Sequence, residues 1–251
     1  NSEFYSHSLK LWESLEQELN YNAMMSQRGI INLFHNDGQR DAAVRRGNAI
    51  VNQGDDAELL DREGVRRLAP FLNFDNNRFP IMGGLMQRRA GTARHDAVAW
   101  GYARAASDLG VDIIQGCEVT GIDRDAKGVT GVQTTRGPIR TKKLCIVVAG
   151  HSGVMAEMAG FRLPVESVAL QALVSEPIKP VIDCVVMANT VHGYLSQSDK
   201  GELVIGGGAD QFNNYTQRGS FQHVEETVRA LVETFPIISR LRMLRQWGGI
   251  V

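Results

Sequence analysis

The unit of this sequence that most restricts its fold is an amphipathic segment, residues 96–109, that is followed at once by β-type residues. Its apolar stripe has helical spacing and consists of Val98, Tyr102, Ala105 and Leu109. Gly110 marks the end of this helix. Residues 111–125, VDIIQGCEVTGIDRD, then predict two short strands. A helix joined this closely to strands indicates a mixed α/β fold.

A second strand-rich region follows in residues 128–150. Segments 129–134 and 139–141 flank a Gly-Pro turn and predict a small meander. The next segment, Leu144 to Ala149, is apolar on both faces, which is typical of a central strand in a parallel sheet. It ends in AGHSG, a glycine-marked turn into a further helix. This part of the chain is therefore βαβ-like.

The two flanking regions have a different character. Before residue 90 the sequence predicts helices at 3–19, 36–54 and 61–73, a strand at 29–35, and an irregular glycine-rich stretch at 80–92. After Pro164 almost all residues predict strands and turns, with a hairpin at SDKG (198–201) and one last helix at 220–236. We expect part of a Rossmann-like nucleotide-binding layer in residues 91–160. It is interleaved with an antiparallel substrate domain in residues 1–90 and 161–251.

Composition excludes several classes of function. With 251 residues, 43% of them apolar, the chain can bury a large core, and a net charge of −1 gives no basic field for nucleic acid or a membrane surface. The apolar runs are too short to cross a membrane. Three widely spaced cysteines, Cys117, Cys145 and Cys184, suit buried thiols in the reducing cytoplasm. Because the chain lacks an initiator methionine and stops in an apolar run, we expect an internal fragment.

The start of the 96–109 helix is the first candidate site. Arg88, Arg89 and Arg94 precede it, and free N–H groups with the positive dipole end favour an anion there, such as a phosphate. The same positive end lowers the expected pKa of His95, so that a neutral, nucleophilic imidazole is predicted. The alternative is a helix-capping histidine beside solvated arginines.

Three further motifs allow both a chemical and a structural interpretation. His151 follows the buried strand and is either a general base or an ordinary turn residue. The glycines at 206–208 are either a phosphate loop or a close backbone approach in a sheet. Trp247 and Gly248 suggest either a backbone close to a flat ring or a simple bend. His192, His223 and the cysteines are expected to be structural, and motifs such as GxGxxG, HExxH and GxSxG are absent.

Several stretches together resemble a known family. They are GGLMQRRAGTARHDAVAWGYARAASDLGVDIIQGCEVTGI, VVAGHSGVMAEMAGFRLPVES, LQALVSEPIKPV, SQSDKGELVIGGG and RQWGGIV. They resemble the β subunits of heterotetrameric sarcosine oxidases, within the superfamily of D-amino-acid-oxidase-like flavoproteins, and the likeness extends along the whole chain.

The resemblance implies an activity and a set of site residues. Such enzymes oxidatively demethylate sarcosine, with FAD taking the hydride equivalent and a covalent FMN passing electrons to oxygen. His95 matches the histidine that holds FMN, with Arg94 and Arg89 beside the phosphate. Val119, Ala149, Gly150, Trp247 and Gly248 match positions near the FAD. The resemblance also implies an α subunit as partner and a small secondary amine as substrate.

The departures from this family define the alternatives. The expected first βαβ unit with its GxGxxG fingerprint and the last glycine-rich segment are not in the sequence, so the fragment alone is expected to be inactive and to lack bound FAD. One alternative is another FAD dehydrogenase of the superfamily, for dimethylglycine or glycerol 3-phosphate. Another is a non-catalytic module that presents a subunit interface.

Overall fold

The computed structural model describes residues 2–75 and 78–251, and its main feature is one large mixed sheet. The strand order is β11-β7-β10-β9-β8-β1-β3-β2, and every neighbouring pair is antiparallel except β1 and β8. The strands are β1 (Ile30–Phe34), β2 (Glu58–Asp61), β3 (Gly83–Gln87), β7 (Ala169–Pro177), β8 (Val185–Ala188), β9 (Gly193–Gln197), β10 (Glu202–Ala209) and β11 (Met243–Ile250). The mixed α/β class is confirmed.

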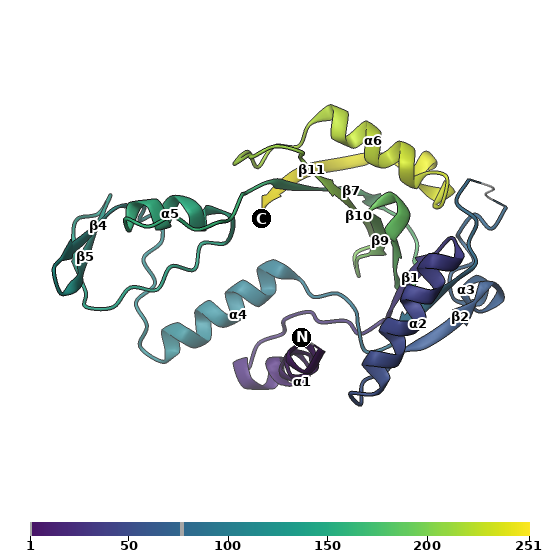
Figure 1. The fold of residues 1–251 in the computed structure, drawn as a ribbon, viewed down its shortest axis with the longest axis horizontal. Helices are drawn as coiled ribbons and strands as arrows, with labels where there is room; N and C mark the ends of the chain where they lie inside the picture. The colour runs from purple at the N-terminus through teal and green to yellow at the C-terminus, as the bar shows by residue number, and fades with distance from the viewer. Residues whose placement is uncertain (1, 76–77) are drawn as a thin grey trace.

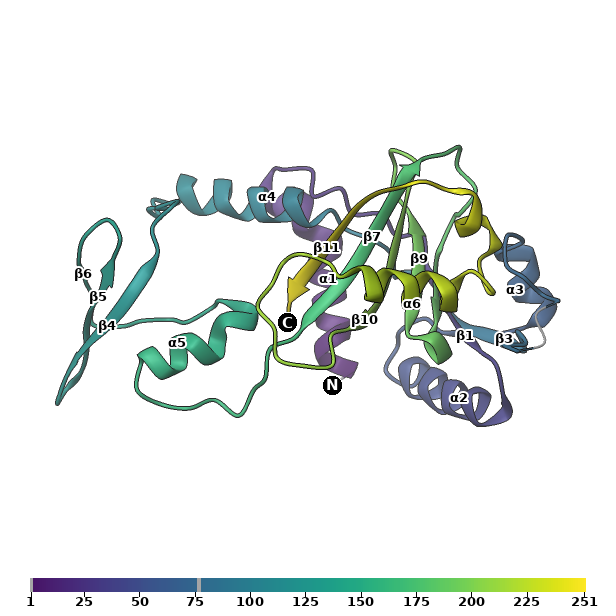
Figure 2. The same ribbon diagram turned by 90° about the horizontal axis from the view of Figure 1, so that it is seen from above.

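One face of this sheet carries the core. In β7 burial alternates along the strand, as expected for a strand with one covered face. The register aligns a buried apolar row across five strands, Leu173, Ile205, Leu195, Val186 and Ile31. The helices α3 (Arg62–Leu68) and α6 (Phe221–Leu231) supply Val65 and Leu231 to the same core. Figures 1 and 2 show α6 lying along the sheet.

The opposite face of the sheet is covered only in part. Helix α2 (Asp37–Val51) contacts β1, β2 and β3, and its Gly47 lies against the side chain of Leu85. A second row in register runs from Trp247 through Ala172, Gly206, Tyr194 and Met187 to Asn32. We call this row and its surroundings on β7, β9, β10 and β11 the open face.

The remaining elements form an arm that extends from the sheet (Figures 1 and 2). It contains α4 (His95–Asp108), a three-stranded sheet, and α5 (Ser152–Met158). The small sheet has the order β4 (Val119–Asp125), β5 (Gly128–Thr134) and β6 (Ile139–Arg140). Helix α1 (Ser2–Leu19) contacts α4, where Gly101 packs against Leu19 and Tyr21. The predicted helix at 96–109, the meander and the SDKG hairpin are confirmed.

Four local expectations from the sequence are wrong. The stretch 80–92 is not irregular, because it contains β3. Only one strand, β4, forms in residues 111–125, and the stripe on α4 is not buried, since Tyr102 is 53% and Leu109 is 87% exposed. Residues 144–148 form no strand, and Val147 is 84% exposed. No described strand lies beside this segment, so its backbone has no ladder to join.

Candidate functional site

His95 is the first residue of α4 and is exposed. Arg94 is the N-cap and makes no side-chain capping hydrogen bond. Instead the Asp96 carboxylate accepts from the backbone N–H of Ala97 (2.9 Å) and from Nε of Arg94 (2.9 Å). The N–H groups of His95 and Asp96 donate to no acceptor among the described residues. The helix start therefore presents free donors and an accessible imidazole together.

The other two arginines of the predicted cluster are paired within the chain. Arg89 makes a bidentate pair with Glu13 of α1 (2.9 and 2.7 Å) and a longer contact with Asp55 (3.5 Å). The hydrogen bonds from Arg89 lower the pKa of Glu13 to about 2. Arg88 pairs with Glu58 of β2 (2.6 Å). Arg94 pairs with Asp96 (2.9 Å), so all three arginines of the cluster form ion pairs within the described chain.

Arg94 also lies near the β9–β10 hairpin. The Ser198 hydroxyl donates to Glu202, and this bond, helped by the positive charges of Lys200 and Arg94, lowers the pKa of Glu202. The charged groups at the start of α4 and at the end of the hairpin are thus close enough to interact electrostatically. The sequence could not show this, because the two segments are far apart along the chain.

A second group of predicted residues meets at the end of β11. Ala149 has a left-handed backbone (φ +47°), which is uncommon outside glycine. Gly150 is buried, and a Cβ there would lie 2.4 Å from a methyl of Ile250. Its carbonyl accepts a hydrogen bond from the Ser167 hydroxyl. The structure thus brings Ala149 and Gly150 against the strand that carries Trp247.

Trp247 itself projects to the open face, next to Ala172 in the register. The guanidinium of Arg245 lies 5.9 Å from its ring centre. Gly248 is buried and donates its N–H to the Gln217 carbonyl (2.9 Å). In this structure its backbone therefore lies close to the loop that contains Gln217. Val119 is placed elsewhere, at the start of β4 opposite Thr134 in the small sheet.

The sequence reasoning missed Tyr194, which occupies the middle of the open face. Burial raises the pKa of its phenol, so the hydroxyl stays protonated and can donate. The ring lies over Gly206, where a Cβ would be only 2.0 Å from a ring carbon. The sequence did contain a signal for this residue: in the predicted hairpin, a tyrosine on one strand lies opposite a glycine on the other.

The glycines and histidines have structural partners. Gly208 has φ +70°, and a Cβ there would lie 2.5 Å from the ring of His223, so the close approach predicted for residues 206–208 is confirmed. The carbonyl of Gly207 accepts from Nε2 of His223 (2.7 Å). His192 adopts the left-handed conformation (φ +49°), and the exposed His151 stacks on Tyr215 at 5.3 Å.

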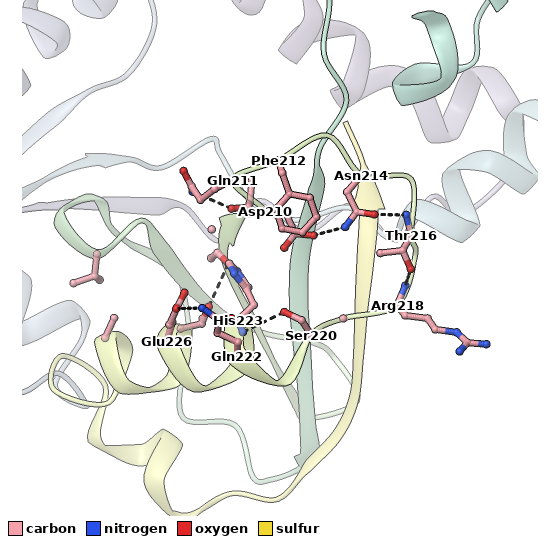
Figure 3. Close-up of a pocket in the computed structure, with 17 residues that line it drawn as sticks. Asp210, Gln211, Phe212, Asn214, Thr216, Arg218, Ser220, Gln222, His223 and Glu226 are labelled. Atoms are coloured by element: carbon pink, nitrogen blue, oxygen red, sulfur yellow. Dashed lines mark hydrogen bonds between the residues drawn. The ribbon is translucent and has the colours of Figure 1, made fainter. Parts of the chain in front are cut away.

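A hollow of about 700 Å³ lies between α6 and the loop 209–220 (Figure 3). Asp210, Asn214, Ser220 and His223 line it, and Arg218 points away from it. Most of these polar groups already bond to one another, as Asp210 does to Asn214 (2.6 Å). Gly207 and Gly208, two of the glycines considered as a phosphate loop, border this hollow, whereas none of the residues matched to the flavins does. No cluster of metal-ligating side chains and no helix suited to crossing a membrane occurs in the described part of the chain.

Comparison with known proteins identifies the family. The model of the FAD dependent oxidoreductase family, DAO, matches residues 1–251. The chain is 60% identical to "Sarcosine oxidase subunit beta" of Rhodobacter capsulatus over 98% of its length, and 60% identical to that of Rhizobium meliloti over 100%. It covers 60% of each relative, so it spans about three fifths of their length.

Solved structures show the same fold. The L-proline dehydrogenase of P. horikoshii superposes with a TM-score of 0.88 over 98% of this chain and 65% of that one, at 23% identity. The glycine oxidase of Geobacillus kaustophilus gives a TM-score of 0.86 over 97% of this chain and 65% of that one, at 20% identity. These matches extend over both the large sheet and the arm.

Proposed function

Because the chain belongs to the family of FAD dependent oxidoreductases, we propose that it is part of a sarcosine oxidase β subunit. The 60% identity to proteins of that name carries this proposal. The reaction is the oxidative demethylation of a small secondary amine, sarcosine. When bound, FAD supplies the acceptor for the hydride equivalent, and FMN supplies the route for electrons to oxygen.

We infer that His95 is the residue that holds FMN covalently. Its imidazole is exposed, stands at a helix start with free N–H groups, and has Arg94 beside it. This arrangement fits a flavin whose ring bonds to the imidazole and whose phosphate lies near the helix end. Arg94 is the better phosphate contact, since it has one carboxylate partner, Asp96, whereas Arg89 has two, Glu13 and Asp55.

The open face is the surface that we assign to the substrate. Tyr194 and Trp247 offer aromatic faces to a cationic amine, and the protonated Tyr194 hydroxyl offers a donor to a carboxylate. Between Trp247 and the Tyr194 ring, which lies over Gly206, the small Ala172 leaves the floor of this face low. The chain's own contribution is thus to orient a small amino acid.

The FAD contacts that we propose are Val119, Ala149, Gly150, Trp247 and Gly248. The left-handed Ala149 and the uncovered backbone before it fit a place where a ligand approaches the main chain. The apolar residues of segments 111–114 and 144–148 are exposed, except for the half-buried Ile146. We propose that the remaining length of the relatives completes the FAD sheet here, and that the 251 residues alone do not hold FAD.

The complex that we propose is a cytoplasmic heterotetramer with an α subunit. Cys117, Cys145 and Cys184 are all free thiols, which suits a reducing compartment. Exposed Phe4, Tyr5 and Leu11 on α1 favour a subunit contact and keep the interface-module alternative open. A protein that carries only acid-releasable FAD would favour the alternative of another superfamily dehydrogenase, for dimethylglycine or glycerol 3-phosphate.

The deciding experiment is acid precipitation of the flavin-loaded protein and of its His95→Ala variant. We expect flavin absorbance to remain with the wild-type precipitate and to be lost from the variant, because no imidazole is left to bond. His192→Ala serves as the control, since His192 has a purely structural position at a turn. An adduct that persists in His95→Ala would disprove the assignment of this residue.

A further inference from the structure

The residues just before His95 are held by the segment 26–28. Ser26 and Thr92 exchange two backbone hydrogen bonds, with N–O distances of 2.8 and 3.0 Å. Gly91 lies so close that a Cβ there would be 1.9 Å from the Ser26 carbonyl oxygen. A displacement of residues 26–28 must therefore move the start of α4.

Arg28 connects this bridge to the β9–β10 hairpin. Its Nε donates to the Ser26 hydroxyl (2.8 Å), and its Nη1 donates to the Gln197 carbonyl (3.2 Å). Its Nη2 forms an ion pair with the Asp199 carboxylate. The planar guanidinium of Arg28 thus donates to acceptors on both the 26–28 segment and the hairpin. A lysine ammonium cannot reproduce this geometry.

The hairpin is itself a rigid support. Gln197 is 5% exposed, and its amide accepts from the N–H groups of Val181 and Ile182 (2.8 and 3.1 Å). The same amide donates to the carbonyls of Lys179 and Gly201 (3.1 and 2.9 Å). Tyr194 lies three residues earlier on the same strand. Arg28 therefore joins the strand of Tyr194 to the helix of His95.

We propose that Arg28 is a positioning residue that fixes the start of α4, and with it His95, relative to the open face. The proposal rests on the proposed function in one respect, the flavin bonded to His95. A flavin bonded to His95 can meet a substrate on the open face only if the start of α4 stays in a fixed position relative to the sheet. The guanidinium fork of Arg28 provides that constraint.

The test compares Arg28→Met and Arg28→Lys with Arg229→Met in the flavin-loaded protein. Arg229 is a matched control, because its ion pair with Glu225 lies on the surface of α6. We expect amide exchange at Ser26 and Thr92 to rise about tenfold or more in both Arg28 variants, the effect of losing charge-assisted hydrogen bonds. The acid-stable fraction of flavin should fall in both, with the acid-releasable FAD unchanged. Arg229→Met should change neither.

The outcomes separate this proposal from the function on which it rests. Unchanged exchange at Ser26 and Thr92 in Arg28→Met would overturn the role of Arg28. Faster exchange with a wild-type level of acid-stable flavin would reduce Arg28 to a structural contact and also overturn it. A wild-type protein without acid-stable flavin would refute the proposed function, while the exchange rates would still decide whether Arg28 holds the helix start.

Discussion

The missing side chain at Gly206 determines where the Tyr194 ring lies. A Cβ at Gly206 would be 2.0 Å from a ring carbon, although the backbone of Gly206 lies outside the left-handed region and accepts alanine. We predict that Gly206→Ala lowers the free energy of unfolding by about 1–3 kcal/mol, the usual range for overpacking. Urea denaturation measures this loss.

The control for this prediction is the same substitution in a Tyr194→Ala background. With the ring removed the added methyl has room, so Gly206→Ala should then cost much less. An equal loss of unfolding free energy in both backgrounds would mean that the position of the Tyr194 ring does not depend on Gly206. The pair thus links a strand glycine to the geometry of the proposed substrate face.

Single residues were predictable where their surroundings are local. The place of His95 at a helix start follows from its neighbours in the sequence, and the structure has it there. The ion pairs of the arginines do not follow in this way, because Glu13 is 76 residues from Arg89. The cluster of cations in the sequence therefore suggested a free anion site, whereas in the fold each of the three arginines has a carboxylate partner.

At the scale of elements, α1 is fastened to the end of β3 through one ion pair. The folded pKa of Glu13 is about 2 and its ordinary value is 4.5, so the ionised carboxylate favours the docked helix. This stabilisation is complete above the ordinary pKa and is lost as the pH falls through the folded pKa. We predict that proteolysis within α1 accelerates over that interval.

Glu13→Gln should remove the acid-dependent step and make α1 susceptible already at neutral pH. Glu18→Gln is the matched control on the same helix, because the Glu18 side chain contacts Ser14 and no arginine among the described residues. If the acid-induced cleavage of α1 were the same in Glu13→Gln and in wild type, another group would have to hold the helix.

Helices and strands could be predicted from the sequence where a single hydrophobic periodicity dominates a segment. Helical periodicity placed α4 within one residue at each end. Strand β3 was missed because its two glycines weaken the β signal. Only the folded sheet shows their purpose, since a Cβ at Gly83 would meet the Phe34 ring at 2.5 Å and one at Gly84 a methyl of Ile31 at 2.6 Å. The partners of these glycines lie on a strand some fifty residues away.

At the scale of the whole molecule, the arm exposes apolar residues such as Val147 and Leu109. The expected central strand at 144–149 has the composition of a buried strand, yet Val147 is 84% exposed and no described strand adjoins it. The sequence pattern is typical of a strand with neighbours on both sides, and among the described residues no strand lies on either side of this segment. Periodicity alone could not reveal this, because it contains no information about neighbouring strands.

Val147→Lys tests whether the additional length of the relatives covers this segment. In the 251-residue chain the change should alter the free energy of unfolding by less than about 0.5 kcal/mol, because the side chain is in water. In a protein of the relatives' full length it should cost about 2 kcal/mol or more, since a charge would replace a buried valine. Phe221→Lys, at an 82% exposed position on α6, should be tolerated in both lengths. Equal tolerance of Val147→Lys in the two proteins would show that the segment stays uncovered, and the completed FAD sheet would have to be abandoned.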